Sequence, residues 1–201
     1  MATQYSSALR TAQLEAIRTV LGSPFQIQLL GGAIPADVAT AASGTLVATF
    51  ASATLAAASG GSIGLTGTPS TTCSAGNDGS LGYFRALTSG GTAHLQGLAG
   101  MARSLSTSAA TAAGGSVLTF ASAINTAQIA VGMAVSGTGV PSGARIATIS
   151  GSTITLSAPS TAGIASGASI TLSPDMVLDN FNLVATQTVQ IASLTITASN
   201  A

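Results

Sequence analysis

The residues best suited to acid-base, nucleophilic or metal chemistry are few in this sequence, which has one histidine, His94, and one cysteine, Cys73. A zinc site takes three or four histidine, cysteine or carboxylate ligands, and a catalytic triad needs a histidine held by a carboxylate beside a nucleophile. A cysteine becomes nucleophilic when a nearby cation lowers its pKa, and no charged residue lies within four positions of Cys73. We therefore expect no metal, an ordinary small residue at Cys73, and at His94 a strand histidine hydrogen-bonded within an interface.

Asp175 and Asp179 form the closest pair of carboxylates in the sequence. Glycoside hydrolysis uses two carboxylates, but in an extended strand positions four apart lie about 13 Å from each other, too far for a paired mechanism. We interpret Asp175 as the point where the chain re-enters its first domain, and Asp179 as part of a turn. The sequence thus predicts no catalytic residue, no cofactor and no enzyme activity.

The composition favours a component of an assembly. The 201 residues are 46% hydrophobic and 5% charged, and five arginines balance five carboxylates to a net charge of zero. Nucleic-acid binding requires several basic residues to neutralise phosphates, so a nucleic-acid partner is excluded. A weakly charged surface rich in Ala, Gly, Ser and Thr promotes association with other protein surfaces.

No segment predicts a membrane anchor or an export signal. Serine, threonine and glycine interrupt every apolar run before the roughly 18 to 20 residues that a bilayer requires. The first residues lack the basic region and apolar stretch of a secretory signal. We expect synthesis in the cytoplasm and no membrane partner.

Residues 6–21 predict one amphipathic helix, with Ser6 or Ser7 capping its start and Gly22 ending it. Leu14, Ile17 and Leu21 are expected to be buried against a β domain or a partner. Membrane-surface helices are rich in lysine and arginine on their polar face, whereas this helix carries Glu15 beside Arg18, which favours a protein partner. The apolar arc contains Leu9, Ala12, Leu14, Ala16, Ile17, Val20 and Leu21.

After Gly22 the apolar period changes from 3.6 residues to two, which is typical of strands with one buried face. The alternation occurs at 25–29, 46–50 and 81–87, with glycine- and serine-rich turns between, as in a sandwich or barrel. In the C-terminal stretch 176–198 the alternation changes phase. Either a β-bulge near residues 192–193 restores it, or the strand is buried on both faces.

The middle of the chain predicts a separate small β domain. Residues 104–174 contain a single charge, Arg145, and include small strands at 117–120, 133–136, 145–149, 153–156 and 169–172, with a hairpin turn at 150–152. We predict a discontinuous outer domain, 1–107 plus 173–201, and an inserted domain, 108–172.

Several stretches resemble the capsid decoration, or cement, proteins of tailed bacteriophages. They are residues 5–10, 13–17, 43–49, 82–86, 94–97, 178–181 and 189–197. The resemblance covers roughly 1–103 and 175–201, whereas the patterns at 131–137 and 143–149 are similar to small β modules added to phage exterior proteins. The resemblance implies a jelly-roll-like β fold, a place on the outer capsid surface of the virion, and binding to the major capsid protein.

The resulting expectation is a mainly β protein, a jelly-roll-like β-sandwich with one N-terminal amphipathic helix and a small inserted β domain facing solvent. Its function would be noncatalytic stabilisation of a phage head by bridging capsid subunits, as a homodimer or, second, a trimer. The alternative is a host-binding head-fibre or tail-fibre module that uses the inserted domain. Partner contacts are expected at Leu9, Arg10, Ile17, Arg18, Tyr83 and Arg85.

Overall fold

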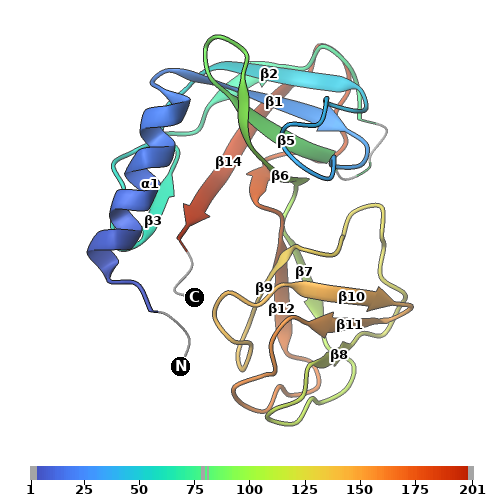
Figure 1. Ribbon diagram of the computed structural model, residues 1–201. Helices are drawn as coiled ribbons and strands as arrows, with labels where there is room; N and C mark the ends of the chain where they lie inside the picture. The colour runs from blue at the N-terminus through green and yellow to red at the C-terminus, as the bar shows by residue number, and fades with distance from the viewer. Residues whose placement is uncertain (1–3, 78–79, 81, 199–201) are drawn as a thin grey trace. The chain divides into compact units, whose positions relative to one another are not determined.

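The structure is a computed structural model that describes residues 4–77, 80 and 82–198. It is mainly β, and the described residues form one helix and fourteen strands (Figure 1). The chain divides into two compact units. Unit 1 consists of Met1–Ala99 with Asp175–Ala201, and unit 2 of Gly100–Pro174.

Unit 1 is built on an eight-stranded sheet that curls (Figure 1). Its order is β2-β1-β5-β6-β13-β14-β3, and β4 also pairs with β14. Ser74 and Ala75, just after β4, donate from their backbone N–H groups to the carbonyl oxygen of Val47 in β2, at 2.7 and 3.3 Å. The strands are β1 (Phe25–Gly31), β2 (Leu46–Ala53), β3 (Ser62–Gly64), β4 (Ser70–Thr72), β5 (Gly82–Leu87), β6 (Ala93–Gly100), β13 (Met176–Leu178) and β14 (Thr188–Thr197).

The predicted strands at 25–29 and 46–50 are confirmed as β1 and β2, and that at 81–87 as β5, although residue 81 lies outside the described residues. Phe84 and Ala86 of β5 face the hydrophobic core, together with Phe25 and Ile27 of β1 and Phe50 of β2. All six residues of β5 are buried, so both faces of this strand are covered.

The predicted helix is confirmed as α1 (Ser7–Leu21). The Ser6 hydroxyl accepts the backbone N–H of Leu9 at 3.2 Å, and Gly22, with φ of +81°, follows the last turn. Leu14 and Leu21 are buried in the core of unit 1, and Ile17 packs against it. The expected burial of this face is therefore confirmed, and unit 1 itself supplies the surface that covers it.

The change of phase in the C-terminal stretch is a β-bulge, one of the two alternatives that the sequence leaves open. Val177 pairs with Ser193, but the next residue of β13, Leu178, pairs with Ile191. The extra residue, Ala192, is exposed, whereas Ile191 and Leu194 on either side of the bulge are buried. One additional residue thus returns the large apolar side chains to the core.

Unit 2 contains two three-stranded antiparallel sheets, β10-β11-β8 and β7-β12-β9. The five strands and the hairpin turn predicted between residues 117 and 172 are confirmed as β8 to β12. The strands are β7 (Arg103–Ser106), β8 (Val117–Thr119), β9 (Ala134–Ser136), β10 (Ile146–Ser150), β11 (Thr153–Leu156) and β12 (Ser169–Ser173).

The boundaries between the units differ from the predicted ones, which placed residues 100–107 and 173–174 in the first domain. Leu105 of β7 pairs with Ile170 of β12, so this stretch is a strand of unit 2. The pairing partner of β7 lies more than sixty residues away in the sequence, so no local signal marks this strand.

Candidate functional site

The residues with catalytic potential lie on or next to several strands of unit 1. His94 is exposed on β6, and Cys73 is buried, which raises the pKa of its thiol. Asp175 accepts the backbone N–H of Leu98 at 3.0 Å, and Asp179 accepts that of Gln190 at 2.9 Å. Within the described part of the chain, no three metal-ligating side chains gather where they could hold an ion.

The Gly-x-Ser-x-Gly spacing of hydrolase nucleophile elbows occurs at residues 60–64, within one of the glycine- and serine-rich stretches that are predicted to be turns. A nucleophile elbow joins a strand to a helix. Here Ser59 and Ser62 exchange backbone hydrogen bonds of 2.9 and 3.0 Å around a tight turn that leads into β3. The Ser62 hydroxyl donates to the Ser59 carbonyl at 3.1 Å, so the motif belongs to a hairpin turn.

The outer face of α1 carries exposed apolar side chains. Leu9 and Val20 are 46% and 53% exposed, and Gln13 and Ala16 between them are also exposed. These positions follow the spacing i, i+4, i+7 and i+11 and so form one stripe along the helix. The stripe lies roughly 100° around the helix axis from the buried face. The single apolar arc predicted from the sequence is therefore two faces, and only one packs on unit 1.

The charged side chains of α1 interact in part with the helix itself and with the loop that lies beside it. Glu15 receives a hydrogen bond from the backbone N–H of Ala58 at 2.6 Å and pairs with Arg18 at 3.0 Å. The Ala58 hydrogen bond, followed by the Arg18 side chain, holds the pKa of Glu15 below its usual value. Arg10 extends along the chain at Gly61 and is half-buried. Of the predicted contact residues on the helix, Leu9 is thus the most open to a partner.

Replacing Glu15 with glutamine is expected to reduce the acid sensitivity of unit 1. Because its pKa is lowered on folding, the stability that Glu15 contributes is fully present above the usual value of 4.5 and is lost as the pH falls through the folded value. Thermal unfolding at about pH 7 and about pH 3 should show a smaller decrease in Tm for Glu15→Gln than for the wild type. Equal decreases would contradict a role for this carboxylate in acid unfolding.

Tyr83 and Arg85 do not present their side chains at the surface, because the loop between β1 and β2 covers them. We call this loop, residues 32–45, the strap. The Tyr83 hydroxyl donates to the Ser43 carbonyl at 2.5 Å and accepts the Ser43 N–H at 2.9 Å. On the neighbouring strand β6, Gln96 donates to the Pro35 carbonyl at 2.9 Å. Side chains from two adjacent strands thus hold the strap against the sheet.

Arg85 is the central anchor of the strap and is only 6% exposed. One terminal nitrogen donates to the carbonyl oxygens of Val38 and Thr40, the latter at 2.6 Å. Asp37 accepts the Thr40 backbone N–H at 2.8 Å, and this bond, with smaller help from the Arg85 charge, lowers the pKa of Asp37. The strap is therefore organised both internally and by the strand beneath it.

The outer side of the strap is mostly small and apolar. Ile34 is 37% exposed, and the exposed alanines of the strap are Ala33, Ala36, Ala39, Ala41 and Ala42.

Tyr83 and Arg85 were predicted to contact a partner directly, but the structure makes them positioning residues for this surface. The sequence signal for the strap is the pair of glycine turns that bound it, Gly31-Gly32 and Ser43-Gly44.

Formal charge is distributed unequally between the two units. Unit 2 contains Arg103 and Arg145 and no aspartate or glutamate, so its formal charge is +2. Unit 1 contains the other three arginines and all five carboxylate residues, so its formal charge is −2. The zero net charge of the whole chain conceals this difference.

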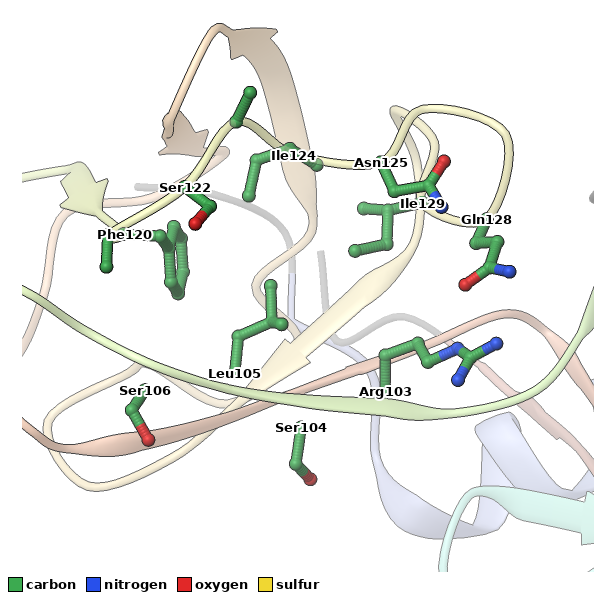
Figure 2. A pocket seen from close by; sticks show the side chains of 12 residues that line it. Arg103, Ser104, Leu105, Ser106, Phe120, Ser122, Ile124, Asn125, Gln128 and Ile129 are labelled. Atoms are coloured by element: carbon green, nitrogen blue, oxygen red, sulfur yellow. The ribbon is translucent and has the colours of Figure 1, made fainter.

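Unit 2 contains a groove of about 400 Å³ (Figure 2). Figure 2 shows Arg103, Asn125 and Gln128 at one end and Phe120 with Ser122 at the other. Leu105, Ile124 and Ile129 lie between the two ends. Arg103 is the only charged residue that lines the groove. The groove could not be predicted from the sequence, because its lining residues come from β7 and from the loop after β8. These two segments are joined through low-complexity sequence.

No protein family model matches the chain, and neither a curated protein nor a solved structure matches it. Among the residues that the structure describes, no helix is both long and apolar enough to cross a membrane.

Proposed function

We propose that this chain is a noncatalytic structural protein that decorates the outside of a tailed-bacteriophage head and stabilises it by bridging subunits of the major capsid protein. In this proposal unit 1 is a jelly-roll-like domain that binds the capsid, and unit 2 is a domain inserted into it that faces solvent. The resemblance of several stretches of unit 1 to decoration proteins suggests the role. The observation that carries the proposal is the anchored, weakly charged surface of unit 1.

Two parts of unit 1 have the properties that a capsid-binding surface needs. The stripe on α1, formed by Leu9, Gln13, Ala16 and Val20, is fixed because the adjacent face of the helix, with Leu14 and Leu21, is buried. The strap is fixed by Arg85 and by its neighbours on the sheet. Small apolar side chains on a fixed backbone lose little conformational entropy on contact, and few charges must be desolvated.

The proposed assembly is a homodimer, with a trimer as the second choice. Capsid subunits are related by symmetry, and a symmetric oligomer presents the same surface to each of them. An oligomer that holds two or three capsid sites gains about 10²- to 10⁴-fold in avidity over a single contact. Weak contacts through a small apolar surface are then sufficient for stable decoration.

The proposal is tested on particles of the encoding phage that have been stripped of this protein. Stripped particles should release DNA at a lower temperature than complete ones, and adding the wild-type chain should restore the release temperature. A Leu9→Glu/Val20→Glu double variant places charge on the α1 stripe and should fail to restore it. Val131→Glu is the matched control, because Val131 is 55% exposed but lies in unit 2. It should restore the release temperature fully.

A second candidate function is host binding by a head-fibre or tail-fibre module, and the groove in unit 2 is the observation that favours it. Under this alternative, stripped and complete particles would release DNA at the same temperature, but stripped particles would lose adsorption to host cells. That combination of results would overturn the decoration role.

A further inference from the structure

We propose that the groove of unit 2 binds a carboxylated saccharide, with Arg103 pairing with the carboxylate. This inference rests on the groove itself and does not depend on the decoration role. The groove has a volume of about 400 Å³, within the usual range of small-ligand sites, and combines one cation, two primary amides and an apolar middle.

The charges of unit 2 favour an anionic ligand. Arg103 is the only charged residue among those lining the groove, and no aspartate or glutamate occurs anywhere in Gly100–Pro174. A carboxylate entering the groove therefore meets a cation and no competing negative side chain of unit 2. The guanidinium presents its N–H groups in a fork that matches both oxygens of a carboxylate, which makes arginine suited to this recognition.

The other lining residues favour a sugar ring as the carrier of that carboxylate. Asn125 and Gln128 lie at the same end of the groove as Arg103 (Figure 2). Their amides offer both donors and acceptors, as adjacent sugar hydroxyls require. Ile129 lies beside them and Leu105 lies further along the middle of the groove, and both provide an apolar surface for the C–H face of a ring (Figure 2). An acidic peptide could also pair with Arg103, but it would leave these neutral amides without a matching row of hydroxyls.

Two polar residues of the lining, Ser104 and Asn125, have polar contacts within unit 2 that limit what they offer a ligand. Ser104 points away from the groove (Figure 2), and its hydroxyl lies 3.2 Å from the Thr171 hydroxyl on the neighbouring strand. Asn125 already accepts the backbone N–H of Ala127 at 3.1 Å, which fixes the side chain and leaves its amide N–H groups as the donors to a ligand. Recognition is therefore expected from Arg103, Gln128 and the Asn125 amide nitrogen.

The test compares glucuronic acid with glucose, because the two share the ring and differ in the oxidation of one carbon. Titration of the full-length, ¹⁵N-labelled chain should shift the backbone signals of residues 103–106 and 120–129 and the side-chain amide signals of Asn125 and Gln128. Glucuronic acid should bind about tenfold more tightly than glucose, since hydrogen bonds between a guanidinium and a carboxylate are stronger than those between neutral groups. Acetate alone should bind more weakly than glucuronic acid, because it lacks the ring.

Variants distinguish a specific contact made by Arg103 from a general effect of the positive charge of unit 2. Arg103→Gln should remove the preference for glucuronic acid over glucose, and Gln128→Ala should weaken both sugars, with signals outside the groove unchanged. Arg145→Gln is the matched control, because it also removes one of the two positive charges of unit 2 but does not line the groove. Its affinity should equal that of the wild type. No shifts with glucuronic acid, equal binding of glucose, or tighter binding of an aspartate-rich peptide would overturn the proposal.

Discussion

Replacing Gly44 with alanine is expected to lower the free energy of unfolding by about 4 kcal/mol, because two costs fall on the same residue. Gly44 has φ of +82°, a left-handed conformation that disfavours every residue with a Cβ atom. A Cβ atom there would also overlap the carbonyl oxygen of Gly31 and lie 2.9 Å from its carbonyl carbon. Both obstacles are backbone atoms at the closed base of the strap, so no side-chain rotation relieves them.

Gly67→Ala separates these two costs. Gly67 has φ of +70°, but an added Cβ atom would meet nothing within 4 Å. This variant should lose only about 1 kcal/mol, the cost of the left-handed conformation alone. Denaturant unfolding of both variants measures the difference. Equal losses would show that the strap can move away from Gly31 without cost, and that its base is less rigid than the structure indicates.

Replacing Arg85 with alanine is expected to lower the free energy of unfolding by about 3 kcal/mol and to release the strap. The change removes the hydrogen bonds to the carbonyl oxygens of Val38 and Thr40 and leaves space under the loop. Burying a guanidinium has its own desolvation cost, which the substitution relieves. The loss of charge-assisted hydrogen bonds and packing exceeds this relief, because alanine fills little of the space that Arg85 leaves.

Limited proteolysis provides the second measurement for Arg85→Ala. Cleavage within residues 33–42 should become faster than in the wild type, since an unanchored loop opens more often. Arg145→Ala is the control, because Arg145 is exposed and lies in unit 2. It should change stability by less than about 1 kcal/mol and leave cleavage of the strap unchanged. Unchanged cleavage of the strap in Arg85→Ala would contradict its role as the anchor.

Elements with strong local signals could be predicted from the sequence. The helix has a serine cap, a glycine stop and a 3.6-residue period, and each of these features depends only on neighbouring residues. The bulge at Ala192 is visible because two alternating patterns meet out of phase, although the sequence alone could not separate it from a doubly buried strand. The hairpin between β10 and β11 is marked by Gly151 between two alternating runs.

Features that depend on distant segments could not be predicted. Tyr83 and Arg85 alternate with apolar residues on β5, a pattern that normally indicates one buried and one open face. The strap covers the second face of β5. The residues next to β5 in the sequence give no signal that this face is covered. The three-residue strands β3 and β4 are too short for a periodic pattern, and both exist through pairing with β14, more than a hundred residues away.

The hydrogen bond from the backbone of Leu98 to Asp175 bears on how such a chain can change over evolutionary time. It joins the end of β6 to the residue before β13, and these two strands are neighbours in the sheet. The chain therefore leaves unit 1 and returns to it at adjacent points, so closing the gap requires only a short connection. Recombination that exchanges the intervening segment would leave the pairing partners of the sheet intact. Descendants of one gene would then share unit 1 while differing completely between these two points.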